Sequence, residues 1–460
     1  MKGFVVAGTH SGCGKTTITL GLMAALRRRG LVVAPFKVGP DFIDPGHHTE
    51  IAGRQSHNLD GWMLSKEDNL EIFSRNTQDA DIAVIEGVMG LFDGYDGRSE
   101  AGSTAQMAKW LGLPVVLVAD VRSMARSAAA LVQGFENFDP GLEFKGVIFN
   151  RVGSPSHLKY LRECLEGNVS MPLLGGLARD ADIAVPERHL GLLTREDHAL
   201  SPMFREKLAD LIEKTVDIDS LINILPDMAP SSIPTAPSRP SVVRIGLAAD
   251  RAFCFYYPEN LEMLEACGAE IVRFSFLNDD TLPADIDGIY LGGGYPELHA
   301  GRISGNRRLK SQILEKWRQG MPVYGECGGF MVLCKSLVDL EGRKYPMVGC
   351  FDFTCRMTSG PPVLGYREIM LSEDTILGDA GTRIRGHEFH YSRLDDPRMK
   401  SVCRAVDRSQ AARDVYGFKA GRCFAGYPHL HFRSRPSVAR AFVQACVTYQ
   451  CERKKLNEAR

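Results

Sequence analysis

One glycine-rich segment near the amino terminus constrains the fold most. The residues from Gly8 to Thr17 read Gly-Thr-His-Ser-Gly-Cys-Gly-Lys-Thr-Thr; they follow an apolar run, Gly3–Ala7, and precede a helix-like stretch, Ile18–Arg29. Such a loop points backbone amides at phosphate oxygens, its lysine adds a mobile cation, and a hydroxyl at the helix start is placed to ligate magnesium. The segment predicts a nucleotide-binding domain, with these binding residues: Gly12, Gly14, Lys15, Thr16 and Thr17.

The loop departs from the standard P-loop in one respect. Five residues separate Gly8 from Gly14, where the standard pattern has four. The order of strand, loop and helix still favours phosphate binding over an incidental turn. The loop alone does not distinguish ATP from GTP, or a synthetase from a motor.

Short apolar runs recur along both halves of the chain. They are continuous rather than alternating, which is typical of parallel strands covered by helices on both faces. The predicted strands are Gly3–Ala7, Val32–Phe36, Ile82–Ile85, Val115–Val118, Gly146–Phe149, Val243–Ala248, Glu270–Phe274, Gly288–Leu291 and Pro322–Tyr324. The fold class is therefore α/β, with two doubly wound domains.

A proline-rich segment separates the two halves. With 460 residues the chain exceeds the size at which a single core usually stops growing. Five prolines lie between Leu225 and Ser241, too many for a helix. We predict an ATP-binding domain over 1–224, a linker over 225–241 and a second domain over 242–460.

Charge and cysteine content exclude several classes. Lys plus Arg number 55 against 56 Asp plus Glu, so no basic field suggests a nucleic-acid partner. No apolar stretch approaches the length of a membrane span, and the first residues do not resemble a signal peptide. Twelve cysteines without paired CxxC spacing do not indicate a disulfide framework or a zinc site. We expect a cytoplasmic protein with no membrane partner that acts on small molecules; whether it forms a homo-oligomer stays open.

Acidic residues follow two of the predicted strands. Asp41 and Asp44 follow Val32–Phe36, and Glu86 and Asp93 follow Ile82–Ile85. Because parallel strands end at one edge, these acids should face the phosphates. Thr16, Asp41 and Glu86 are the predicted magnesium ligands, and Asp44 and Asp93 are predicted to orient substrate. For Asp93, within Phe-Asp-Gly-Tyr-Asp-Gly, a turn role is supported equally.

The second half contains a cysteine between glycines. Cys327 lies in Gly-Glu-Cys-Gly-Gly directly after an apolar strand, the thiol version of a nucleophile elbow at a helix start. The helix dipole is expected to favour thiolate there. A late histidine must then move protons, and His429 and His431 are both candidates.

Two further clusters accompany the cysteine. Gly293 and Gly294, after strand Gly288–Leu291, are predicted to present amides to the oxyanion formed when Cys327 attacks an amide. His387 and His390 suggest a metal, but one short cluster is more typical of a loop or a substrate contact.

Several segments resemble known families. The spacing of the glycine-rich loop, together with Glu86-Gly87, resembles dethiobiotin synthetase, and Gly325–Gly329 with a late histidine resembles class I glutamine amidotransferases of flavodoxin-like fold. Other segments resemble the cobyrinate a,c-diamide synthase family over nearly the whole chain: Val38–Pro45, Glu86–Gly94, Pro186–Leu192 and Asp250–Leu261.

The resemblance favours His429 over His431, because the late histidine of class I amidotransferases follows closely on an aromatic residue. These enzymes commonly carry a glutamate two residues further on, where this chain has His431. The acid that orients the imidazole is therefore missing or supplied from elsewhere.

The resemblance also implies a reaction. ATP and Mg²⁺ would convert a carboxylate into an acyl phosphate, and ammonia from glutamine would displace phosphate, at the a and c acetates of cobyrinate. Because free ammonia protonates in water, we expect a shielded path between the two sites. Residues expected to hold the macrocycle are Phe42, Ile43, Arg188 and His189.

Two alternatives stay open at this point. The same chemistry on hydrogenobyrinate or nickel-sirohydrochlorin fits the residues equally. A P-loop switch ATPase with a decayed amidotransferase domain is a different class, against which the elbow around Cys327 and its late histidine argue.

Overall fold

The computed structural model describes residues 1–178, 187–188, 191–192, 201–228, 240–395 and 399–458. The chain divides into two compact units, Met1–Thr235 and Ala236–Arg460, and each is described by itself. The domain bounds expected from the sequence, 1–224 and 242–460, stay a prediction.

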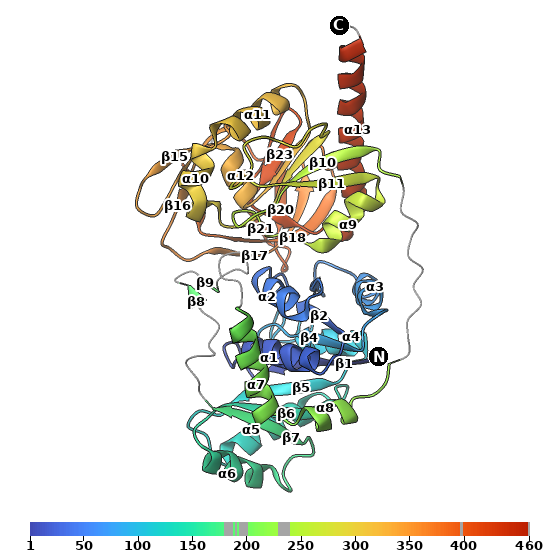
Figure 1. The fold of residues 1–460 in the computed structure, drawn as a ribbon, viewed down its shortest axis with the longest axis vertical. Helices are drawn as coiled ribbons and strands as arrows, with labels where there is room; N and C mark the ends of the chain where they lie inside the picture. The colour runs from blue at the N-terminus through green and yellow to red at the C-terminus, as the bar shows by residue number, and fades with distance from the viewer. Residues whose placement is uncertain (179–186, 189–190, 193–200, 229–239, 396–398, 459–460) are drawn as a thin grey trace. The chain divides into compact units, whose positions relative to one another are not determined.

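The first unit is built on a seven-stranded sheet in which every pair is parallel (Figure 1). The strand order is β3-β2-β4-β1-β5-β6-β7, so β1 lies between β4 and β5. From Phe4 to Ala7 the side chains of β1 are fully buried, as expected of a continuous apolar strand. The bounds are β1 Lys2–Gly8, β2 Val33–Val38, β3 His57–Leu59, β4 Ile82–Glu86, β5 Val115–Asp120, β6 Phe144–Val152 and β7 Leu173–Ala178.

Helices join these strands, and the glycine-rich loop and the acids that follow the strands lie at the same edge of the sheet. Helix α1 begins at Lys15, directly after the glycine-rich loop, and packs against α7, where Gly21 allows close approach to Ile212. The bounds are α1 Lys15–Arg28, α2 Ile43–Ala52, α3 Lys66–Thr77, α4 Thr104–Leu111, α5 Ser127–Phe138, α6 Pro155–Leu165, α7 Pro202–Thr215 and α8 Ile218–Ile224. A short antiparallel pair, β8 Glu187–Arg188 and β9 Gly191–Leu192, precedes α7.

The second unit is built on a six-stranded sheet of order β11-β10-β12-β13-β23-β22. All its pairs are parallel except β22 with β23 at one edge. The bounds are β10 Val243–Ala248, β11 Ala269–Phe274, β12 Gly288–Leu291, β13 Val323–Glu326, β22 Gly417–Ala420 and β23 Cys423–Gly426. With the first sheet, this confirms the predicted α/β class.

Two further sheets in the second unit were not predicted: a mixed sheet, in which β14 pairs with β16 in parallel, and an antiparallel sheet. One has the order β15-β14-β16-β19 and the other β21-β20-β17-β18-β24. Their bounds are β14 Cys334–Val338, β15 Lys344–Pro346, β16 Phe351–Met357, β17 Val363–Leu371, β18 Arg383–His390, β19 Ser392–Asp395, β20 Cys403–Val406, β21 Ala412–Arg413 and β24 His429–Leu430. The expectation of a loop around His387 and His390 is therefore wrong, because both lie in β18.

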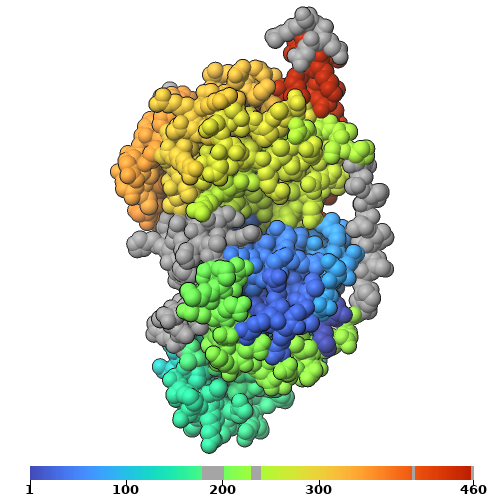
Figure 2. Space-filling model, in the orientation of Figure 1, coloured from blue at the N-terminus to red at the C-terminus, as the bar shows by residue number. Residues whose placement is uncertain are grey.

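Helices complete the second unit: α9 Pro258–Ala266, η2 Pro296–His299, α10 Ala300–Gly305, α11 Arg307–Arg318, α12 Gly328–Leu333, η3 Phe432–Ser434 and α13 Ser437–Glu458. The last turns of α13 project from the body of this unit (Figures 1 and 2). Among the described residues, no helix combines the length and apolar character that crossing a membrane requires.

Candidate active sites

The glycine-rich loop leads into α1 through a backbone conformation that favours glycine. Gly14 caps the helix in a left-handed conformation, φ 98°, and a Cβ there would lie 2.0 Å from the amide nitrogen of Asn150. The Asn150 side chain instead donates to the carbonyl of Cys13 at 2.9 Å. Lys15 donates to the carbonyl of Met89 at 2.5 Å. These contacts hold a loop shaped for phosphate beside β1.

Acids from two neighbouring strands meet beside this loop, around a lysine. Lys37 lies 2.5 Å from Asp44 Oδ2 and 2.9 Å from Glu86 Oε1. Glu86 Oε1 also accepts from the Thr16 hydroxyl at 2.7 Å, and Glu86 Oε2 lies 2.7 Å from His48 Nε2. Strand pairing explains the meeting, since β2 runs parallel to β4 with Lys37 opposite Glu86.

Burial and neighbouring charges shift the pKa values of this cluster in both directions. Burial alone would lower the pKa of Lys37, but Asp44 and Glu86 raise it above its ordinary value. Burial would raise the pKa of Glu86, but Lys37 and His48 hold it below its ordinary range. Burial lowers the pKa of Lys15. Burial and the neighbouring Asp44 raise the pKa of Asp41.

The cluster fits a magnesium ion bound together with a nucleotide. Mg²⁺ keeps waters and phosphate oxygens and takes only one or two protein ligands. Asp44 Oδ1 is buried and accepts no hydrogen bond within the part of the chain that the structure describes, and the Thr16 hydroxyl lies 3.5 Å from Asp44 Oδ2. Both oxygens of Glu86 are already occupied. Asp44 Oδ1 is thus an additional candidate ligand, and Thr16, Asp41 and Glu86 stay the predicted ones.

The structure describes the side chains of only some of the other predicted substrate residues. Phe42 and Ile43 are half-buried at the start of α2, next to Asp44. Asp93 Oδ2 accepts from the Gly90 amide at 2.9 Å, which is the turn role left open by the sequence. Arg188 lies in β8 with its side chain outside the description, and His189 lies outside the described residues.

In the second unit, Cys327 forms the turn between β13 and α12. It adopts φ 47°, a left-handed conformation that a non-glycine residue rarely takes, and its amide donates to Gly426 at 2.7 Å. Strain of this kind is typical of a nucleophile elbow. The next residue, Gly328, packs so closely that an added Cβ would lie 3.2 Å from the amide nitrogen of Gly294.

The two expected oxyanion donors, Gly293 and Gly294, have different surroundings. The amide of Gly293 donates to the carbonyl of Phe255 at 3.2 Å, so in this arrangement it serves a bridge between chain segments. Gly294 lies beside the elbow, and the amide of Gly328 donates toward the Cys327 sulfur. Gly294 and Gly328 are therefore better placed than Gly293.

The two late histidines pack against different neighbours. The ring of His429 lies against the Gly293 backbone, where an added Cβ would stand 2.2 Å from its Cε1 atom, and it stacks on His387 at 4.9 Å. The His431 ring instead lies tilted against Tyr257, with ring centroids 4.4 Å apart, and its Nε2 lies 3.8 Å from Glu259. Because Gly293 adjoins the loop beside the elbow, the geometry favours His429.

Burial sets the protonation of the thiol and the imidazole. It raises the pKa of Cys327 above its ordinary value, to which the Glu297 carboxylate adds, and it lowers the pKa of His429 to about 3. Burial works against the thiolate that the helix dipole is expected to favour, and α12 has only six residues. A neutral imidazole is then the form that accepts the thiol proton.

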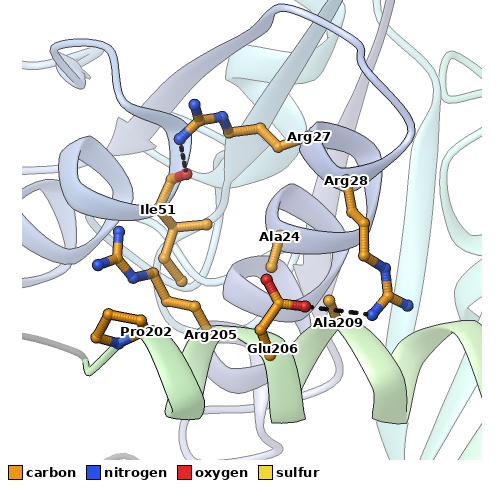
Figure 3. A pocket seen from close by; sticks show the side chains of 8 residues that line it. All are labelled: Ala24, Arg27, Arg28, Ile51, Pro202, Arg205, Glu206 and Ala209. Atoms are coloured by element: carbon orange, nitrogen blue, oxygen red, sulfur yellow. Dashed lines mark hydrogen bonds and ion pairs between the residues drawn. The ribbon is translucent and has the colours of Figure 1, made fainter.

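An open pocket in the first unit lies away from this chemistry. Its volume is about 380 Å³, and it is found between α1, α2 and α7, at the opposite end of α1 from the phosphate loop (Figure 3). Its cations are engaged: Arg27 donates to the carbonyl of Ile51 at 2.8 Å, and Arg28 lies 3.6 Å from Glu206. The pocket does not contribute to the predicted sites.

Sequence reasoning missed four residues that the structure brings to these sites: Lys37, His48, Asn150 and Gly328. Lys37 directly follows a predicted strand, and its charge opposite Glu86 was the signal that could have found it. For Asn150, at the end of β6, the shared strand edge was a comparable signal.

Comparison with known proteins agrees with this pairing of sites. Residues 4–193 match the CobQ/CobB/MinD/ParA nucleotide binding domain, and residues 244–437 match the CobB/CobQ-like glutamine amidotransferase domain. A nucleotide-binding domain joined to a glutaminase domain defines a glutamine-dependent amide ligase. The switch ATPase with a decayed second domain is thereby set aside.

Relatives along the whole chain define the family. A cobyrinate a,c-diamide synthase of Syntrophotalea carbinolica is 46% identical, covering 96% of this chain and 98% of the relative. Those of Dehalococcoides mccartyi and Leptospira interrogans are 42% and 41% identical, each covering 96% of this chain and, respectively, 97% and 98% of the relative. The chain belongs to the cobyrinate a,c-diamide synthase family.

Proposed function

We propose that this chain uses ATP and glutamine to amidate the a and c acetate carboxylates of cobyrinate. A carboxylate does not react with ammonia at neutral pH until its oxygen becomes a leaving group. Lys15 and the amides of the Gly12–Lys15 loop would hold the phosphates, and Lys37 would steady the acids beside them. Bound Mg²⁺, held through Thr16 and Asp44, would neutralise charge on the phosphates.

The ammonia would come from Cys327. In this proposal His429 takes the thiol proton, the sulfur attacks the glutamine carboxamide, and the imidazolium protonates the departing ammonia. Water then releases glutamate from the thioester. Gly294 and Gly328 would donate to the oxyanion.

The strained backbone of Cys327 is the observation that carries this proposal. A scaffold domain would have no need to hold a cysteine at φ 47° next to the close approach of Gly328 and Gly294. We expect Cys327→Ala to lower glutamine-dependent amidation at least about 1000-fold while ammonium-dependent amidation survives. Mass spectrometry of cobyrinate, ATP, magnesium and either nitrogen source measures both as successive acid-to-amide mass changes.

Controls separate the substrate from the chemistry. Cys451→Ala removes an exposed thiol of α13 and is expected to leave both activities unchanged. Hydrogenobyrinate and nickel-sirohydrochlorin are run beside cobyrinate, and preference for one of them would move the substrate assignment within the same reaction. Loss of both activities in Cys327→Ala, with its fold intact, would contradict two separate sites.

A further inference from the structure

Glu326, the residue before Cys327, is a buried carboxylate with a complete set of donors. Its Oε1 accepts from the Leu430 amide at 3.1 Å and from the Tyr324 hydroxyl, and its Oε2 accepts from the Tyr290 hydroxyl at 3.0 Å. Only 2% of the residue is exposed. The carboxylate is thus fixed in one place at the end of β13.

This carboxylate reaches the segment that carries His429 at two points. Leu430, whose amide it binds, is the neighbour of His429 in β24. Glu326 Oε2 also lies 3.9 Å from His429 Nδ1, with both side chains 2% exposed. Since Nδ1 faces the carboxylate, Nε2 is the nitrogen left for the thiol proton.

We propose that Glu326 is the positioning residue for His429, supplying from the residue before the nucleophile the acid that class I amidotransferases place after the histidine. This rests on the proposed glutaminase role of Cys327. When the proton moves from Cys327 Sγ to His429 Nε2, the imidazolium stands beside the fixed carboxylate. The sulfur bonds to the carboxamide carbon, the carbon–nitrogen bond breaks, and the same proton leaves with ammonia.

Charge in a dry site makes this contact effective. At 3.9 Å between groups so deeply buried, a carboxylate stabilises a new positive charge far more than it would in water. Among the described residues, His387 and His390 of β18 also face His429, and neither offers a negative charge. Glu326 is the acid that the described residues bring to this imidazole.

The competing arrangement is the neighbouring pair, His431 with Glu259. Their side chains are fully buried and 3.8 Å apart, nearly the same separation. Glu259, in α9, therefore provides a matched carboxylate: it has the same chemistry and burial, but it faces the other histidine.

Protonation of Glu326 gives the proposal a specific pH signature. Burial raises the pKa of Glu326 to about 7, while the pKa of His429 lies at about 3. Above pH 7 the carboxylate is charged and assists proton transfer, and below it the group is neutral and the assistance is lost. The acid limb of glutaminase activity should therefore have its midpoint near pH 7.

The test measures glutaminase kcat and KM of the full chain as a function of pH for E326Q, E259Q and the unaltered protein. For E326Q we expect kcat to fall at least about 10-fold with KM changed less than about 2-fold, and the limb near pH 7 to disappear. E259Q should keep that limb. Thermal unfolding of each variant confirms that the isosteric amides leave the fold in place.

Each outcome decides the matter. Loss of the limb in E259Q and not in E326Q would assign the base to His431 and overturn the proposal. A limb that survives in E326Q, or a loss confined to KM, would leave Glu326 a structural residue. If Cys327→Ala retains glutaminase activity, the proposed function fails first, whatever E326Q does.

Discussion

At the scale of single residues, Lys37 of the first unit affects both the stability of the fold and the acids of the predicted phosphate site. It is 5% exposed and stands between two carboxylates of the predicted phosphate edge. Without it, Asp44 and Glu86 would be like charges a few ångströms apart in a dry site. The same cation that pairs with both acids therefore holds the pKa of Glu86 below its ordinary range.

Replacing Lys37 with methionine should cost stability and synthesis together. Removing one partner of a buried ion pair leaves uncompensated charge and costs about 3–5 kcal/mol. Because the pKa of Glu86 is lowered, its contribution is present above the ordinary value of 4.5 and is lost as pH falls. The deficit of Lys37→Met should hence be largest near neutral pH and shrink in acid, measured by hydrogen exchange of β1 and β4 amides.

A surface lysine gives the comparison. Lys145 pairs with Glu143, and the Glu143 side chain is 60% exposed, so Lys145→Met should cost less than about 1 kcal/mol. Glutaminase activity should be unchanged in both variants. Equal stability losses for Lys37→Met and Lys145→Met would show that the buried cluster contributes nothing special.

Many of the site residues that the sequence predicts share one property: each follows a run whose hydrophobicity marks a strand. Asp44, Glu86 and Cys327 were located this way. The sequence presents Glu326 only as a neighbour of Cys327, because its proposed role depends on Leu430, 104 positions away, which no local pattern connects to it. The bond from the Gly293 amide to the distant Phe255 has no local signal either, and the oxyanion role of Gly293 stays a prediction.

At the scale of elements, the junction between the glycine-rich loop and α1 depends on one backbone conformation. Gly14 has φ 98°, and the Asn150 side chain fills the space where a Cβ would stand. Any side chain at this position meets both a strained backbone and an occupied volume.

Gly14→Ala should therefore weaken ATP binding more than it weakens the fold. Asn150 must leave the Cys13 carbonyl, which displaces the loop amides, and we expect the ATP dissociation constant to rise at least about 10-fold, measured by calorimetry. Gly30→Ala is the matched control, with φ 84° and nothing within 4 Å of the new Cβ. It should show only backbone strain, about 1–3 kcal/mol, with ATP affinity kept. The same affinity in both variants would contradict the assigned loop geometry.

Element prediction succeeded where one physical signal was enough. Buried parallel strands such as β1, β4 and β10 are continuous apolar runs, and they were located to within a residue or two. Strand β18, read as a loop, has one exposed end and places Arg383, Arg385 and His387 in the sheet, so its sequence carries no apolar run. Its pairing with β17 and β24, not its composition, makes it a strand.

At the scale of the whole molecule, the two proposed reactions share ammonia as an intermediate. Ammonia loses its nucleophilicity when it is protonated in water. Ammonia at neutral pH is mostly protonated, so release into solution would waste glutamine and slow amidation. A covalent link between the two activities is useful only if ammonia passes within one chain. The expected path of ammonia can be tested by mixing two variants, each of which is inactive in one of the two reactions.

Lys15→Ala should abolish amidation and keep the glutaminase, and Cys327→Ala should do the reverse. Mixed in equal amounts with glutamine and no added ammonium, the two variants should give less than about 10% of the amidation of the unaltered protein, because ammonia from one chain must cross water to reach the other. Adding an ammonia-consuming dehydrogenase should abolish this residual amidation and leave the unaltered protein active. Full recovery in the mixture, or loss of the unaltered protein's activity with the dehydrogenase, would mean that ammonia travels through bulk solvent, and the joined chain would then need another explanation.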